Sequence, residues 1–200
     1  MHKAGAIFFL LLIVFPVLLT AQDDDGDGWD YYDDGQFAKG DQTFIISLGT
    51  VFPMVFVMNG KAYDHKIDPP VGGLGSLAYN YYITPQLFLG GELSGMFMPT
   101  LGGNTLYVIP IGFRAGYQFN VWRLEFPVSA ALGVAWHRYL NNTYFGIYMK
   151  AGGAAYFRIT QLLSIGINTN WYWLPEWTSD RNKNVDGNLL DLTLSARIHF

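Results

Sequence analysis

The first residues that could do chemistry form an acidic segment, Asp23-Asp24-Asp25-Gly26-Asp27-Gly28. With Asp34 at the twelfth position, Asp23, Asp25 and Asp27 match the D-x-D-x-D-G core of a calcium-binding loop. Asp replaces the bidentate Glu that normally closes such a loop, and no flanking helices are predicted. A solvated acidic arm accounts for the same residues. The sequence therefore predicts an arm over residues 22–41, with a calcium site as the alternative.

A second set of charged residues lies inside apolar segments, namely Glu92, Arg114, Arg123, Glu125, Lys150, Arg158, Asp191 and Arg197. Charges that share a low-dielectric interior must find partners there. Their positions suggest three pairings: Glu92 with Arg114, Lys150 with Asp191, and Glu125 with either Arg123 or Arg158. Such a network either plugs the interior or lines a water-filled pore.

Catalysis has few candidate residues. His65 lies near Asp64 and Asp68, and His137 is separated from Ser129 by seven residues. Neither group combines a nucleophile, a base and an orienting carboxylate. We therefore expect no enzymatic activity and no cofactor.

The elements that position these residues follow from composition. Of the 200 residues, 50% are hydrophobic, 17% are aromatic and only 14% are charged, with a net charge of −4 and no Cys. The charge argues against a nucleic-acid-binding protein, and the lack of Cys excludes a disulfide scaffold. The chain must bury or cover an unusually large apolar surface.

The first 21 residues predict a secretory signal peptide. His2 and Lys3 precede an apolar run over residues 6–19, and small residues before Gln22 offer a cleavage site. An uncleaved membrane anchor is the alternative. No later run of 18 apolar residues is free of strongly polar side chains, so spanning helices are not predicted. A closed β-barrel is the other structure that satisfies its backbone in lipid.

Period-2 alternation supports the barrel. In the last segment one face carries only apolar side chains, Leu190, Leu192, Leu194, Ala196, Ile198 and Phe200. Eight such segments lie between residues 42 and 200, and all eight charges named above fall on the polar face. A soluble β-sandwich also alternates, but its crowded apolar face would be the interior. Here the face with the small residues carries the charge, as a membrane barrel requires.

The connections predict the orientation and one weak point of the wall. Tight turns near residues 83–87, 119–121 and 158–162 alternate with longer loops over 53–70, 99–104, 138–142 and 175–188. This alternation places both termini on the periplasmic side. Pro110 and Pro127 lie within strands and cannot donate a ladder hydrogen bond. They predict either local bulges or a lateral seam in the wall.

The opening GDQTFIISLG at 40–49 and the closing LTLSARIHF at 192–200 resemble those of small eight-stranded outer-membrane barrels, and the OmpW/OprG-like group best. Spirochaetes carry divergent members. The resemblance implies that Leu194, Ala196, Ile198 and Phe200 are read by the barrel-assembly machinery. It also implies that small hydrophobic solutes cross the outer membrane.

We therefore expect an all-β protein: a signal peptide over 1–21, a periplasmic arm over 22–41 and a membrane-spanning, eight-stranded, antiparallel up-and-down barrel over 42–200. Its expected partners are outer-membrane lipid, the assembly machinery and small hydrophobic solutes, not nucleic acid. A non-conducting barrel that is structural, or that binds an extracellular ligand through its loops, is the alternative function.

Overall fold

The structure is a computed structural model that describes residues 37–58, 61–63, 71–99, 104–140, 142–176 and 185–200. These residues all lie within one compact unit, residues 34–200. Within the part of the chain so described, no helix has the length and apolar character needed to cross a membrane.

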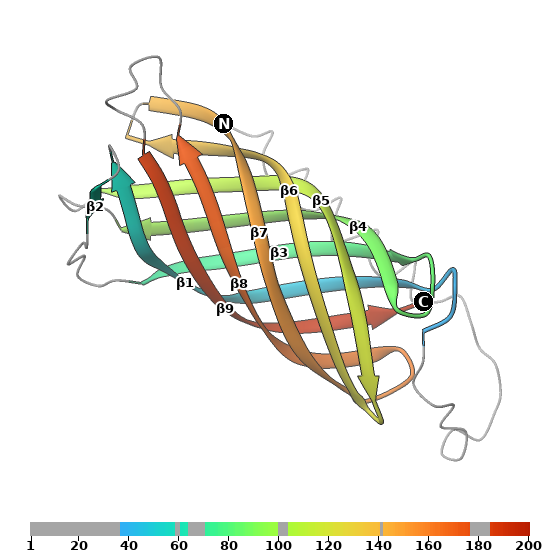
Figure 1. Cartoon of the computed structure of the whole chain (residues 1–200). Coiled ribbons are helices and arrows are strands. Elements are labelled where there is room, and N and C mark those ends of the chain that lie inside the picture. The colour runs from blue at the N-terminus through green and yellow to red at the C-terminus, as the bar shows by residue number, and fades with distance from the viewer. Residues whose placement is uncertain (1–36, 59–60, 64–70, 100–103, 141, 177–184) are drawn as a thin grey trace, which may run out of the picture. The chain divides into compact units, whose positions relative to one another are not determined.

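The described residues form nine antiparallel strands, and eight of them close into a barrel (Figure 1). The strands are β1 (Gln42–Met58), β2 (Lys61–Tyr63), β3 (Gly72–Tyr82), β4 (Leu87–Pro99), β5 (Thr105–Val121), β6 (Leu124–Tyr139), β7 (Asn142–Arg158), β8 (Leu163–Glu176) and β9 (Val185–His199). Each strand of the barrel pairs with its neighbours in sequence, and pairing of β1 with β9 closes it. The predicted eight-stranded up-and-down barrel is confirmed.

Side-chain burial alternates along the strands as the sequence pattern predicts. In β9 the polar positions Asp191, Thr193, Ser195 and Arg197 are buried in the lumen, whereas Leu194 is 67% exposed on the outer face. A barrel whose outer face is apolar and whose lumen is polar is suited to a lipid environment.

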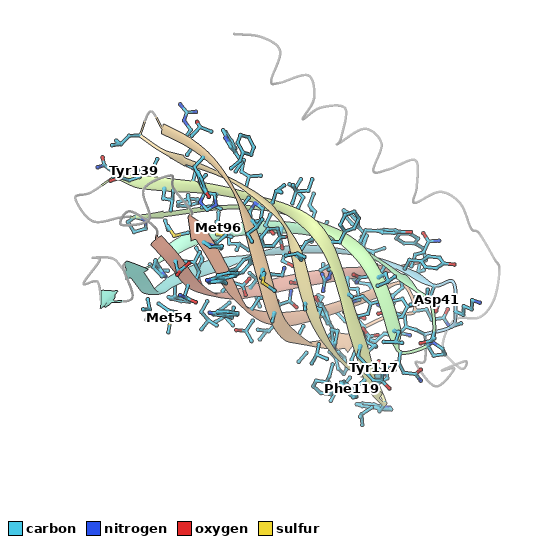
Figure 2. The ribbon with its side chains drawn as sticks, turned by 45° about the horizontal axis from the view of Figure 1, so that its top comes forward. Asp41, Met54, Met96, Tyr117, Phe119 and Tyr139 are labelled. Carbon is cyan, nitrogen blue, oxygen red and sulfur yellow. The ribbon has the colours of Figure 1, made fainter. Side chains whose placement is uncertain are left out.

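The barrel has two distinct ends. At one end, here called the turn end, lie residues 37–41, Phe200 and the connections at 83–86, 122–123 and 159–162. At the other, here called the loop end, β4, β6 and β8 finish. Figure 2 shows Asp41, Tyr117 and Phe119 toward the turn end and Tyr139 and Met54 toward the loop end.

Several strands are longer than the sequence pattern predicts. β1 continues through a register shift between Pro53 and Val55, reaches Met58 and pairs with β2, inside a segment expected to be a loop. β6 runs to Tyr139 and β8 to Glu176. One turn is also displaced: β5 runs to Val121, so the turn falls at 122–123 instead of 119–121. Its Trp122 has φ +54°, in the positive range that two-residue hairpin turns use.

Candidate functional site

The turn-end half of the lumen holds a charge cluster centred on Glu125, which is 1% exposed. Its Oε1 lies 2.6 Å from Arg158 Nε, and its Oε2 lies 2.9 Å from Arg197 Nη1. Arg197 Nη1 also donates to Gln118 Oε1 at 3.1 Å, and its guanidinium carbon lies 3.9 Å from the ring centroid of Tyr156. One carboxylate thus contacts a fully buried guanidinium group, that of Arg197, and a half-buried one, that of Arg158.

A second cluster lies further along the lumen and is centred on Glu92. Lys150 Nζ is 2.7 Å from Glu92 Oε2, and Arg114 Nε is 4.0 Å from the same oxygen. The Tyr148 hydroxyl donates to Glu92 Oε1 at 3.1 Å. Arg114 also donates to Ser129 Oγ at 3.0 Å. This cluster depends on the small size of the luminal residues around it.

Gly112 shows why small residues are needed there. A Cβ at this position would lie 2.6 Å from the Tyr148 hydroxyl oxygen and 2.5 Å from the carbonyl oxygen of Leu132. A side chain at Gly112 would therefore push the hydroxyl away from Glu92.

Not every expected pairing forms. Glu92 contacts Arg114, and Glu125 contacts Arg158, as expected. Lys150, however, forms its salt bridge with Glu92, so its expected contact with Asp191 is wrong. Asp191 accepts hydrogen bonds from the Asn170 backbone nitrogen at 2.7 Å and from Asn170 Nδ2 at 3.0 Å.

Arg123 is placed differently from the other charges that the sequence singled out. It lies in the β5–β6 turn, and its guanidinium carbon is 5.5 Å from the Trp122 ring centroid. The displaced turn is the reason, because a strand that ends at Val121 leaves Arg123 outside the alternating pattern. The other seven charges line the lumen.

The space between the two clusters is small. A cavity of about 30 Å³ is lined by residues of both clusters, including Glu92, Lys150 and Arg197. A buried water needs at least about 10–15 Å³ of such volume, so the cavity has room for about two waters. The charged side chains of the two clusters therefore fill most of the space between them.

The loop-end half of the lumen is mainly apolar, with the imidazole of His137 beside Val108 as a polar exception, and the sequence pattern does not predict this. A buried cluster there includes Val51, Leu74, Met96, Met98, Val108, Leu174 and Leu189. Figure 2 shows Met96 on the loop-end side of the barrel. Seen from the loop end, these side chains pack against one another above a floor formed by the Glu92 cluster. The part of the lumen that they fill is here called the apolar chamber.

The barrel wall is interrupted where the chamber meets this floor. Pairing of β4 with β5 runs as far as Leu93 and Ile111 and resumes at Met96 and Val108 in the same register. The missing pairs are those of Pro110 and Ile109, and a proline cannot donate a ladder hydrogen bond. Because the register is unbroken, the bulge interpretation of Pro110 is wrong. We call this interruption the β4–β5 gap.

Pro127 produces a similar gap between β6 and β7. Pairing stops at Glu125 and Tyr156 and resumes at Val128 and Gly153, again without a register shift. Pro127 lines the small polar cavity. This second gap therefore borders the charged half of the lumen and not the apolar chamber.

A groove of about 690 Å³ lies on the outer face over the β4–β5 gap. Gly95 and Ile109, the two outward-facing residues of the gap, line it together with Phe97, Tyr107, Trp136, Arg138 and Leu140. Met96, a member of the luminal apolar cluster, also lines it. The groove and the apolar chamber thus share a wall at the point where the ladder is broken.

The turn end is covered by Phe37, which precedes the first strand. Its ring is 3% exposed and stacks on Tyr82 with a centroid distance of 4.0 Å and an interplanar angle of 8°. The guanidinium carbon of Arg158 lies 5.1 Å from the Phe37 ring centroid. Gly40 holds the following turn, with φ +102° and a hydrogen bond from its nitrogen to the Tyr82 carbonyl.

Replacing Phe37 by Ala is expected to lower the free energy of unfolding by about 3 kcal/mol, because a buried ring and its stacking on Tyr82 are lost. Denaturant unfolding of the refolded barrel in lipid vesicles measures this. Lys39→Ala, at an exposed position two residues away, is the matched control and should leave stability unchanged. Equal stability of the Phe37 variant and the wild type would contradict the placement of the ring.

The residues that the sequence assigned to barrel assembly lie on the outer face of β9 and at the chain end. Leu194 is 67% and Phe200 60% exposed, and Ala196 and Ile198 are half-buried. The calcium candidates Asp23, Asp25, Asp27 and Asp34 lie outside the described residues, as do His65, the signal peptide and most of the predicted arm.

A protein-family model matches residues 22–198 of the chain, and the family is a spirochaete one. An uncharacterized protein of Treponema pallidum (strain Nichols) is 30% identical over 129 residues, which cover 64% of this chain and 59% of that protein. The chain spans about half the length of the curated relatives it matches.

Solved structures show the same fold. Neisserial surface protein A has a TM-score of 0.59 and 13% identity, covering 82% of this chain and 100% of its own. The outer membrane protein OprG from Pseudomonas aeruginosa has a TM-score of 0.53 and 8% identity, covering 84% and 99%. The chain therefore belongs to this spirochaete family and has the fold of the small eight-stranded outer-membrane β-barrels.

Proposed function

We propose that this protein is an outer-membrane transporter that passes small hydrophobic solutes sideways through its wall into the bilayer. The observation that carries the proposal is the division of the lumen into an apolar half and an ion-paired half, with the β4–β5 gap at their boundary. The outer-membrane location is supported by the predicted signal peptide and by the neighbours that share the fold.

The composition of the apolar chamber favours a hydrophobic molecule as the transported solute. Met96 and Met98 are among its buried side chains, and methionine adapts its shape readily to a new neighbour. An apolar molecule that displaces these side chains loses no hydrogen bonds. A charged molecule would be desolvated there and would meet few polar groups, such as His137 Nε2.

The two charge clusters favour exit of the solute through the wall over passage to the turn end. Salt bridges of 2.7 Å at Glu92 and 2.9 Å at Glu125 lie across the direct route to the turn end. Passage of an apolar molecule through these clusters would separate buried charges, which is costly. The β4–β5 gap lies above the floor, and fewer backbone hydrogen bonds must break for the strands to part there.

Replacing Pro110 by Ala is expected to lower the uptake rate of an uncharged hydrophobic dye about three- to tenfold. The variant adds a backbone N–H where the ladder is broken, and one hydrogen bond stabilises the closed wall by about 0.5–1.5 kcal/mol. The measurement is the uptake of N-phenyl-1-naphthylamine by Gram-negative cells that carry equal amounts of folded barrel.

Pro127→Ala is the matched control, because its gap borders the charged half of the lumen. Its uptake rate should equal that of the wild type. Equal rates for Pro110→Ala and the wild type would contradict the lateral route. A wild-type rate no higher than that of cells without the barrel would favour the non-conducting alternative, in which the loops bind a ligand.

A further inference from the structure

Arg138 is an unusual residue for the outer face of this barrel. The extension of β6 to Tyr139 makes it an outward-facing strand residue, exposed beside Trp136 near the loop end. The charges within β4, β5 and β7 all point into the lumen. Within the described part of the chain, no carboxylate lies within salt-bridge distance of Arg138.

An arginine at this height is tolerated because its guanidinium can reach the polar interface while its carbon stem lies against apolar neighbours. Trp136 and Tyr107, both of which line the groove, are side chains that favour the same interface. Arg138 therefore offers an anion-binding group at the interfacial end of an otherwise mostly apolar groove.

The remainder of the groove fits a hydrocarbon chain. Gly95 lies within it, and a Cβ at this position would meet nothing within 4 Å. Phe97 and Ile109 supply apolar walls, and the volume of about 690 Å³ falls within the usual range for small-molecule sites, about 300–1,000 Å³. Because Met96 lines both the groove and the chamber, the groove leads back to the β4–β5 gap.

We propose that this groove binds a fatty acid, with its carboxylate on Arg138 and its hydrocarbon chain lying toward Gly95 and Ile109. A guanidinium matches a carboxylate in bidentate geometry, and a single arginine neutralises a single negative charge. The inference rests on the proposed function: the fatty acid is the solute that leaves the chamber through the gap, and Arg138 receives its head group at the surface.

The test is quenching of tryptophan fluorescence by 9,10-dibromostearic acid, added to the refolded protein in detergent micelles at pH 8. The wild type should show saturable quenching, and Trp136→Phe should lose the saturable part. Arg138→Gln should weaken the affinity for the acid about tenfold, since the charge-assisted contact is lost. The methyl ester should bind the wild type as weakly as the acid binds Arg138→Gln.

Arg123→Gln is the matched control, because it removes an arginine from the turn that precedes β6, at the opposite end of the barrel. This variant should retain wild-type affinity. Equal affinities of Arg138→Gln and the wild type, or of the acid and its methyl ester, would overturn the proposal. It would also be overturned if dibrominated phosphatidylglycerol quenched Trp136 and stearic acid did not relieve that quenching. The groove would then hold a bilayer lipid.

The two proposals fail separately. Quenching reports occupation of the groove and needs no transport, whereas the dye in the Pro110→Ala experiment carries no charge. Unchanged dye uptake in Pro110→Ala together with loss of acid binding in Arg138→Gln would leave a fatty-acid site without lateral transport. The reverse pattern would leave the transporter with a different solute.

Discussion

Replacing Glu125 by Gln is expected to lower the free energy of unfolding by about 3–5 kcal/mol. Removing one partner of a buried ion pair leaves an uncompensated charge in a low-dielectric interior. Here the loss is shared by two guanidinium groups, because Glu125 contacts both Arg158 and Arg197. Arg197 is fully buried and depends on this carboxylate for its counter-charge.

The measurement is reversible denaturant unfolding of the barrel refolded into lipid vesicles. Arg123→Gln, at a half-buried residue of the β5–β6 turn, is the control and should lose less than about 1 kcal/mol. Adding Arg197→Met to Glu125→Gln should recover part of the loss, because the buried positive charge is then absent. A loss below about 1 kcal/mol for Glu125→Gln alone would show that water hydrates this cluster.

The fold was predictable because each strand carries two distinct faces. A slip of one residue in register would turn Leu194 inward and Arg197 into lipid, so the alternation itself fixes which residues face the lumen. The period of 2 and the turn residues also give the strand order of an up-and-down barrel. None of this depends on contacts between residues far apart in the sequence.

The apolar chamber was not predictable in the same way. Around Met96 on β4 and Val108 on β5 both faces of each strand are apolar, so the alternation does not show which face points into the lumen. Composition along one strand cannot show whether an inward methionine meets another apolar residue or a charge. The residue that it meets depends on how far every other strand is shifted along the barrel axis.

Contacts across the lumen were predictable only in part, because the stagger between strands shifts each partner along the axis. Glu92 is close to Arg114 on the adjacent strand, but it also reaches Lys150 on β7. Phe37 precedes the first strand, in a segment dominated by acidic residues. A single aromatic residue outside any periodic segment carries no signal that it inserts into the barrel mouth.

Joining Gly95 to Ile109 by a disulfide is expected to abolish uptake of the uncharged dye and to restore it on reduction. The two residues face each other across the β4–β5 gap, because the register is the same on both sides of it. The chain contains no Cys, so the Gly95→Cys, Ile109→Cys variant forms one disulfide without competition. A covalent bond between β4 and β5 prevents the strands from parting, whereas the lumen keeps its ion pairs.

The matched control is Leu132→Cys, Met149→Cys, a pair of outward-facing neighbours on the β6 and β7 strands. Its uptake should be the same oxidised and reduced, because this part of the wall is fully paired. If the disulfide at the gap left uptake intact, the solute would have to leave through the turn end. It would then pass Phe37 and both charge clusters, and the Glu125→Gln variant should raise uptake. A lateral route predicts no such rise, so the two variants together decide by which way the solute leaves the barrel.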